Sequence, residues 1–233
     1  MGMMKRIMPS VAIILAVCII AGVSAFKEAV RRVGGVYAES PQKIIIDAGH
    51  GGADGGAEAM DGTIEKDLNL SIALKLASLM KISGYKVIMT RTADTSTDNS
   101  SSGFNKKGDL NNRLKLMEEN PSAIFVSIHL NKFTTSAASG AQVFYSQKSE
   151  CSKELGQSIQ KSIVNLLQPE NNRVIKMGTN STYILKNATV PAVIVECGFI
   201  SNKAELTLLK TEDYQRKMAF SIMAGIMDFG LNF

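Results

Sequence analysis

The sequence predicts an α/β domain in which helices cover both faces of a β-sheet. Short apolar runs of strand length alternate along the chain with longer segments whose apolar residues recur every three or four positions. Two of the short runs, 44–46 and 192–195, are apolar at every position, which indicates strands that are buried on both faces. Such strands, separated by helices, are typical of a sheet packed between two helical layers.

The first half of the domain is expected to hold three strands and two helices. Apolar residues at three- and four-residue steps define the helices. Gly84 lies where the first helix should end with a C-cap, and Pro121 follows the second. Residues 95–103, rich in Ser, Thr, Asp and Asn, are expected to form an exposed loop. The expected elements of this half are 44–46, 65–80, 85–89, 109–119 and 124–128.

The second half is expected to hold three more strands and three helices. Asn202, with Glu205 three residues later, has the spacing of a capping box at the start of a short helix. Pro169 ends a long amphipathic helix that precedes it. The other expected elements of this half are the strands 141–145, 182–185 and 192–195 and the helices 149–168 and 213–229.

The amino-terminal residues have the composition of an export segment. Lys5 and Arg6 precede an apolar run that ends at Ala25 in a sequence resembling a signal-peptide cleavage site. The run is also long enough to remain as an uncleaved membrane anchor. The expected divisions are a signal peptide or membrane anchor at 1–25, a stem at 26–42 and the folded domain at 43–233. The domain is therefore expected on the outer side of the membrane, either secreted or held by the anchor.

Charge and cysteine content exclude some classes of function. The net charge is +5 and the pI is near 9.0, a mild excess that suits an anionic cell wall or membrane surface. The sequence has no basic stripe with interleaved aromatic residues, so no nucleic-acid partner is expected. Cys151 and Cys197 are interpreted as two separate thiols and not as a disulfide framework.

The chain has two histidines, and both follow apolar strands. His50 lies four residues beyond Ile46 in a glycine-rich turn, and His129 lies one residue beyond Ile128. In an α/β fold, ligand sites gather where strands end in loops. A single histidine at such a position is more often structural. Two in the same situation, with no others in the chain, favour a shared metal ion.

Two glutamates complete the candidate site. A catalytic zinc takes three protein ligands and keeps one position open for water. Glu65 is the preferred third ligand because it lies at the start of a helix, on its apolar face; the alternative is an ordinary helix-start glutamate. Glu196 ends an apolar strand, where a carboxylate is costly to bury unless it is paired or functional. It is interpreted as a general base; the alternative is an ion pair with a buried arginine such as Arg113.

Five motifs in order resemble the zinc-dependent N-acetylmuramoyl-L-alanine amidases of the amidase 3 family, over about 43–229. Among them, the chain is most similar to the germination-specific, spore-cortex amidases of endospore formers. Ala48 stands where that family usually has proline. The motifs are IDAGHGGADGGA at 46–57, EKDLNL at 65–70, VIMTR at 87–91, SIHLN at 127–131 and PAVIVECGFISN at 191–202.

The resemblance implies a single catalytic domain with a twisted, mostly parallel (mixed) sheet. It also implies one Zn²⁺ per chain and hydrolysis of the amide between N-acetylmuramic acid and L-alanine in peptidoglycan, with spore cortex as the expected substrate. The resemblance places zinc ligands at His50, Glu65 and His129, and the catalytic base at Glu196. Asn131 is expected to orient substrate or a ligand loop, and Ser127 and Asp47 are expected to hydrogen-bond the ligands; the alternative for each is local turn or loop bonding.

The resemblance further implies partners and a location. Cortex amidases act in the spore intermembrane space or cell envelope, and their product feeds a deacetylase that leads to muramic-δ-lactam. A regulatory partner protein is a further expectation, whereas the oligomeric state is left open. Residues 95–103 are too short and polar to form the inhibitory helix of some relatives. Two rival functions remain: a zinc peptidase that cuts within stem peptides, and a non-catalytic wall-binding module.

Overall fold

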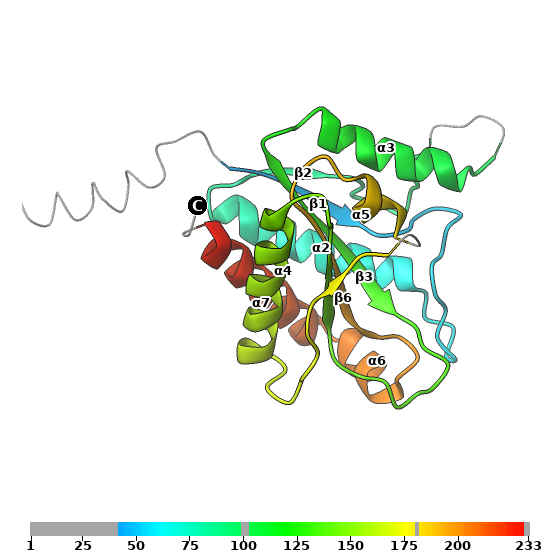
Figure 1. Cartoon of the computed structure of the whole chain (residues 1–233). Helices are drawn as coiled ribbons and strands as arrows, with labels where there is room; N and C mark the ends of the chain where they lie inside the picture. The colour runs from blue at the N-terminus through cyan, green and yellow to red at the C-terminus, as the bar shows by residue number, and fades with distance from the viewer. Residues whose placement is uncertain (1–41, 99–102, 180–181, 231–233) are drawn as a thin grey trace, which may run out of the picture. The chain divides into compact units, whose positions relative to one another are not determined.

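A mixed six-stranded sheet forms the centre of the described chain (Figure 1). It is seen in a computed structural model that describes residues 42–98, 103–179 and 182–230. The strand order is β2-β1-β3-β6-β4-β5; the first four are mutually parallel, and β4 runs antiparallel to β6. This confirms the predicted mostly parallel, mixed sheet. The strands are β1 (Lys43–Ala48), β2 (Lys86–Met89), β3 (Ala123–Asn131), β4 (Gln142–Tyr145), β5 (Lys176–Met177) and β6 (Ala192–Phe199).

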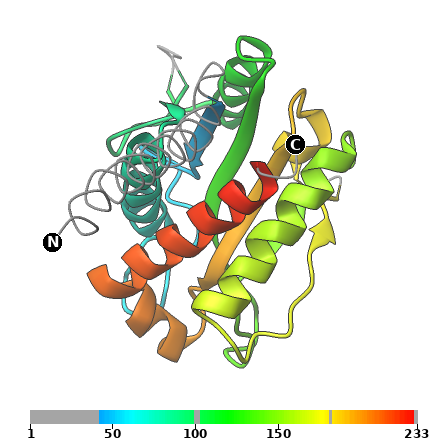
Figure 2. The same cartoon turned by 90° about the vertical axis from the view of Figure 1, so that its left-hand side faces the viewer.

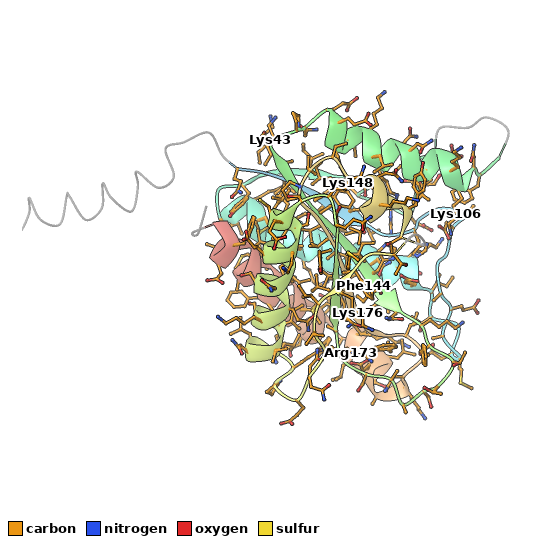
Figure 3. All side chains as sticks on the ribbon, viewed as in Figure 1. Lys43, Lys106, Phe144, Lys148, Arg173 and Lys176 are labelled. Atoms are coloured by element: carbon orange, nitrogen blue, oxygen red, sulfur yellow. The ribbon has the colours of Figure 1, made fainter. Side chains whose placement is uncertain are left out.

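Helices cover both faces of this sheet, as predicted. Figure 2 shows α7 lying between α2 and α4 on one face, while α3 and α5 lie on the other face in Figure 1. Side chains fill the space between the sheet and these helices (Figure 3). The helices are α2 (Glu65–Ile82), α3 (Lys106–Glu118), α4 (Glu150–Leu166), α5 (Tyr183–Asn187), α6 (Lys203–Leu209) and α7 (Glu212–Gly230).

Strand alternation separates two apolar clusters. Ile44, Ile46 and Val126 join the larger cluster beneath α2, α4 and α7. Their neighbours Ile45 and Phe125 join the smaller cluster beneath α3 and α5. Successive strand residues point to opposite faces, so an apolar residue at every position serves both layers. This alternation also sends Ser127 and His129 to the side of the sheet that Phe125 faces.

One predicted strand is wrong. Residues 182–185 were expected to be extended, but Tyr183–Asn187 is the short helix α5. The backbone N–H of Lys186 donates to the carbonyl of Thr182 at 3.0 Å, a helical hydrogen bond. Ile184 and Leu185 both enter the smaller cluster, which adjacent residues of one strand would not do. A short apolar run fits either structure, and packing decided this one.

Other boundaries differ less. The two-residue edge strand β5 was not predicted. Helix α3 begins three residues before the expected start, because the side chain of Asn105 accepts a hydrogen bond from the N–H of Gly108 and caps it. In the loop expected at 95–103, part of which lies outside the described residues, the hydroxyl of Thr97 donates to the carbonyl of Asp109 at 2.8 Å. That end of the loop is therefore tied to α3.

The two predicted helix signals can be checked directly. Gly84 has φ +88° immediately after the C-cap of α2, as a glycine C-cap signal implies. The Asn202 side chain accepts from the N–H groups of Ala204 and Glu205 and caps α6. The Glu205 carboxylate, however, accepts from Gly140 and Phe199, so the reciprocal half of the predicted capping box is absent.

The expected export segment at 1–25 and the stem at 26–42 lie, apart from Gln42, outside the described residues. Within the described ranges, no helix is long and apolar enough to cross a membrane. Cys151 and Cys197 are both free thiols, and Cys197 is buried.

Candidate metal centre

The turn after β1 holds His50 in an unusual backbone conformation. His50 has φ +61°, the only positive φ of a non-glycine residue in the described ranges. Gly51 and Gly52 follow with φ values of +135° and +57°. The turn is closed by paired backbone hydrogen bonds between Gly51 and Asp54, at 2.8 and 3.1 Å. Left-handed conformations of residues with a β-carbon are uncommon and often occur at functional sites.

Glu65 is fixed by several donors at the first position of α2. Its side chain is buried, with the residue 3% exposed. Oε2 accepts from the N–H of Ala57 at 2.8 Å, and Oε1 accepts from the N–H of Leu130 at 3.1 Å and from Nδ2 of Asn69 at 3.2 Å. The carboxylate is therefore positioned by the glycine loop, by β3 and by its own helix at once.

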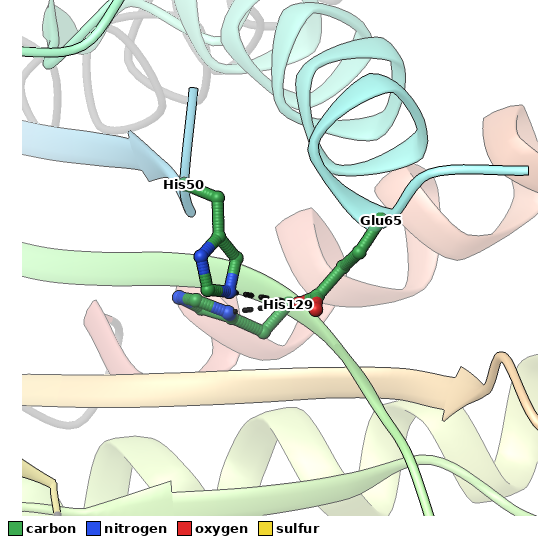
Figure 4. A group of neighbouring side chains, drawn as sticks. All are labelled: His50, Glu65 and His129. Carbon is green, nitrogen blue, oxygen red and sulfur yellow. Dashed lines mark hydrogen bonds and ion pairs between the residues drawn. The ribbon is translucent and has the colours of Figure 1, made fainter. Parts of the chain in front are cut away.

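His50, Glu65 and His129 converge (Figure 4). Oε1 of Glu65 lies 3.4 Å from Nε2 of His50 and 3.0 Å from Nδ1 of His129. One donor atom from each residue lies within 4.8 Å of the others. In a tetrahedral zinc site with bonds of roughly 2.0–2.1 Å, ligand atoms are about 3.3 Å apart. The two separations from Oε1 of Glu65 are close to that value, so these two imidazoles and the carboxylate suit a zinc ion with a fourth position for water.

Two glycines make this convergence possible. A β-carbon at Gly49 would lie 2.2 Å from Nε2 of His129. A β-carbon at Gly56 would lie 2.6 Å from both Oε2 of Glu65 and Cδ2 of His50. Any side chain at either position would displace a candidate ligand. The glycines of the turn therefore provide space for the ligands as well as backbone freedom.

The charges of the cluster reinforce one another. Burial opposes ionisation of Glu65, but its hydrogen bonds and charge interactions with His129 and His50 outweigh burial and hold its pKa well below the usual range. Burial likewise opposes protonation of His50, yet Glu65 and Asp54 together raise its pKa. Asp54 Oδ2 lies 2.9 Å from Nδ1 of His50, without the alignment of a hydrogen bond. The cluster thus concentrates negative charge where a cation would sit.

Glu196 lies beside the cluster on the next strand. Its Cα is the register partner of His129 across β3 and β6. Its Oε2 is buried and has no hydrogen-bond partner in the described part of the chain. Burial, with a smaller contribution from the charge of Glu65, raises the pKa of Glu196 to about 7 against the opposing effect of the two histidines. An unpaired carboxyl that titrates near neutrality can exchange protons with a reactant.

The alternative for Glu196, an ion pair with Arg113, does not occur. The Arg113 guanidinium pairs with Asp47 and, at 2.9 Å, with Asp109. Cys197, next to Glu196, is buried in the apolar cluster on the opposite face. Of these two neighbouring residues, only Glu196 therefore faces the candidate metal centre.

The other three candidate residues, Asp47, Ser127 and Asn131, do not belong to the cluster of His50, Glu65 and His129. Asp47 accepts from the hydroxyls of Ser127 and Thr90, and pairs with Arg113. Neither Asp47 nor Ser127 hydrogen-bonds a histidine ring in the described residues. Asn131 lies at a register irregularity in β3, where its carbonyl accepts from the N–H of Ile200 at 2.9 Å. Its side chain makes no hydrogen bond to any described residue.

Two arginines donate hydrogen bonds to backbone carbonyls of this turn, and these contacts were not predicted. Arg113 donates from Nη2 to the carbonyl of His50 at 3.0 Å. Arg91 donates to the carbonyls of Ala48 and Gly49, at 2.8 and 3.0 Å. Arg91 lies in one of the recognised motifs, two residues beyond the end of β2. Its position at a strand end was therefore the available signal. No sequence pattern showed that it would bind backbone carbonyls.

Known proteins are similar to this chain over most of its folded domain. The profile of the Amidase_3 family, N-acetylmuramoyl-L-alanine amidase, matches residues 44–228. The germination-specific N-acetylmuramoyl-L-alanine amidase of Bacillus subtilis is 34% identical over 189 residues, covering 80% of this chain and 78% of that protein. The N-acetylmuramoyl-L-alanine amidase LytC of the same organism is 29% identical, and there the match covers 35% of the relative.

Solved structures of N-acetylmuramoyl-L-alanine amidases are also similar to this chain. The CwlD amidase from Clostridioides difficile, determined in complex with the GerS lipoprotein, has a TM-score of 0.77 and 41% identity, covering 81% of this chain and 98% of that one. The N-acetylmuramoyl-L-alanine amidase from Clostridium difficile 630 has a TM-score of 0.70 and 32% identity, covering 82% and 97%. The chain belongs to the N-acetylmuramoyl-L-alanine amidase family.

Proposed function

We propose that this amidase is zinc-dependent and hydrolyses the bond between N-acetylmuramic acid and L-alanine in spore-cortex peptidoglycan. His50, Glu65 and His129 hold one Zn²⁺ in this proposal, and Glu196 is the catalytic base. The observation that carries it is the convergence of the three donors beside the unpartnered carboxyl of Glu196. A zinc ion held there supplies a Lewis acid and lowers the pKa of a bound water.

The protein's own residues divide the remaining work. Glu196 takes a proton from the attacking water and delivers it to the departing alanine nitrogen. Its raised pKa suits both transfers, since a group that titrates near 7 accepts and releases a proton readily at neutral pH. The positive charge of a bound metal would lower this pKa and favour the base form at the start of the reaction.

The surrounding polar groups fix the ligands. In the proposal, Ser127 and Asp47 act through Arg113, which donates to the carbonyl of His50. They thus support the ligand turn without touching the metal. Asn131, two residues beyond His129 and with no side-chain partner in the described ranges, is proposed to orient substrate.

The cortex assignment rests on relatives. The B. subtilis relative is named germination-specific, and another, from Bacillus anthracis, is named a cell wall amidase. We place this enzyme in the cell envelope or spore intermembrane space, secreted or anchored by residues 1–25. There its product would feed a deacetylase that leads to muramic-δ-lactam. A regulatory partner protein is proposed because the C. difficile amidase was solved bound to a lipoprotein.

Metal content and muropeptide analysis, run on wild type and on Glu196→Ala, test the function. The wild type should contain one zinc and release stem peptides that begin at L-alanine. The variant should keep zinc and release no stem peptides. Loss of zinc from the variant would make Glu196 a ligand or a structural residue. Stems cut internally, with the lactyl amide intact, would establish the peptidase instead.

The wall-binding alternative makes a separate prediction. A binding module would support germination equally well without zinc and without Glu196. Complementation of a strain lacking the enzyme with Glu196→Gln therefore distinguishes the two functions. Restored germination would overturn the catalytic proposal.

A further inference from the structure

One arginine on the catalytic side of the sheet has an unusual set of partners. Arg173 donates from Nε to the carbonyl of Ser139 at 2.6 Å, and from Nη1 to Oε1 of Gln142 at 3.2 Å. Its guanidinium carbon lies 4.6 Å from the centre of the Phe199 ring. These contacts fix the guanidinium plane, because an arginine that stacks on a ring and donates two hydrogen bonds has little rotational freedom left.

Arg173 has no carboxylate partner in the described ranges, whereas Arg113 and Arg216 each have at least one. Arg113 pairs with Asp47 and Asp109, and Arg216 with Glu212 at 3.6 Å. Nη2 of Arg173 makes no hydrogen bond to a described residue, and Nη1 keeps one further N–H. Paired Nη1 and Nη2 donors match the two oxygens of a carboxylate. A half-buried arginine held by neutral acceptors is thus prepared to bind an anion from solution.

The strands place this guanidinium near the catalytic base. Gln142, which Arg173 contacts, is the antiparallel register partner of Glu196. Directly opposed residues of two strands project from the same face, with β-carbons about 4.5–5.5 Å apart. Phe199 lies three residues beyond Glu196 on the same strand. Arg173 therefore contacts the residue that lies directly opposite Glu196 across β4 and β6.

We infer that Arg173 binds the free carboxylate of the acidic residue that follows the L-alanine in the stem peptide. An extended peptide advances about 3.3–3.6 Å per residue, so a carboxylate at that position would reach the guanidinium while the scissile amide lies at Glu196. This inference rests on the proposed function. It makes Arg173 a substrate-binding residue that selects stems with an unmodified acidic residue, against stems in which that carboxylate is amidated.

The test compares two muropeptides that differ only in whether the acidic residue after L-alanine is free or amidated. Arg173→Gln should raise KM for the free acid about tenfold or more, because charge-assisted hydrogen bonds are lost. Its kcat should change little. For the amidated stem, wild type and variant should have KM values within about threefold of each other. Arg173→Lys keeps the charge but not the forked pair of N–H donors. Its KM for the free acid should therefore lie between those of wild type and Arg173→Gln.

Arg216→Gln is the matched control, since Arg216 is an exposed arginine on α7 whose change should leave both KM values unaltered. Thermal unfolding checks that each variant is folded. Calorimetric binding of the two muropeptides to Glu196→Gln, with and without Arg173→Gln, gives a readout independent of turnover. An equal loss of affinity for both muropeptides, or no loss for either, would overturn the inference. If wild type cuts neither lactyl amide, the proposed function fails instead, and calorimetry still decides the role of Arg173.

Discussion

The first halves of β1 and β3 contrast with their second halves. In the first halves, Ile44, Ile45 and Phe125 are fully buried and apolar on both faces. In the second halves, Asp47 and Ser127 are also buried, and His129 reaches the candidate metal centre. The same strands therefore pass from an apolar core to a polar site within a few residues. The first halves stabilise the sheet, which allows the second halves to carry groups that are costly to bury.

The two carboxylates at this end of the sheet, Asp47 and Glu196, differ in their partners. Asp47 is paired with Arg113 and hydrogen-bonded by Ser127 and Thr90. Glu196, at the same end of the sheet, has a buried oxygen without a partner in the described chain. A satisfied carboxylate supports structure, whereas an unsatisfied one is costly and is better explained by function. Four substitutions, at His129, Glu196, Asp47 and Ile44, separate the roles of these regions.

Removal of a candidate ligand should have the largest effect. His129→Ala leaves two donors, so zinc affinity should fall more than about 100-fold, beyond the loss known for residues that merely support a ligand. Activity should fall below detection. Competition with a chromogenic chelator measures the affinity, and Arg216→Ala is the control. A variant that bound zinc as tightly as wild type would remove His129 from the ligand set.

Glu196→Gln should be next. Loss of a general acid–base group should lower kcat by about 10²–10⁴-fold. Zinc content should be unchanged, and the thermal midpoint of the metal-free protein should stay constant or rise, because an unpaired carboxyl is removed. Muropeptide hydrolysis and thermal unfolding measure the two effects. A large fall in the midpoint would show that the carboxyl is structural.

These two residues also show how far sequence reasoning reaches. The alternation of β3 and the scarcity of histidine were enough to select His129, and a carboxylate after an apolar strand was enough to select Glu196. Sequence could not show that Gly49 and Gly56 provide space for the ligands, since a close approach depends on segments distant in the chain. The prediction of a strand at 182–185 was wrong for the same reason, because tertiary packing of Ile184 and Leu185 overrode a local pattern.

Asp47→Asn tests the satisfied carboxylate. Removing one partner of a buried ion pair should lower the free energy of unfolding by about 3–5 kcal/mol. Burial opposes ionisation of Asp47. The charge of Arg113, together with the hydrogen bonds that Asp47 accepts from Ser127 and Thr90, nevertheless lowers the folded-state pKa of Asp47. Its stabilisation is therefore complete above the unfolded pKa of about 3.9 and is lost as the pH falls through the lower folded value.

Urea unfolding between pH 7 and pH 2 measures both consequences. Wild type should lose stability in acid below about pH 4, and Asp47→Asn should lose less over that interval. Glu119→Gln, at the exposed end of α3, should match wild type. An acid dependence unchanged by Asp47→Asn would assign the effect to other carboxylates.

The smallest effect is expected in the apolar half. Ile44 is fully buried in the larger cluster, so Ile44→Val should lower the free energy of unfolding by about 0.5–1.5 kcal/mol. Ile82→Val is the control, because Ile82 is 85% exposed and should contribute nothing measurable. Zinc affinity and kcat should equal wild type in both variants, because Ile44 lies six residues from the nearest ligand. A fall in zinc affinity for Ile44→Val would show that the two halves of the strand are coupled, so that packing in the core also sets the position of His50.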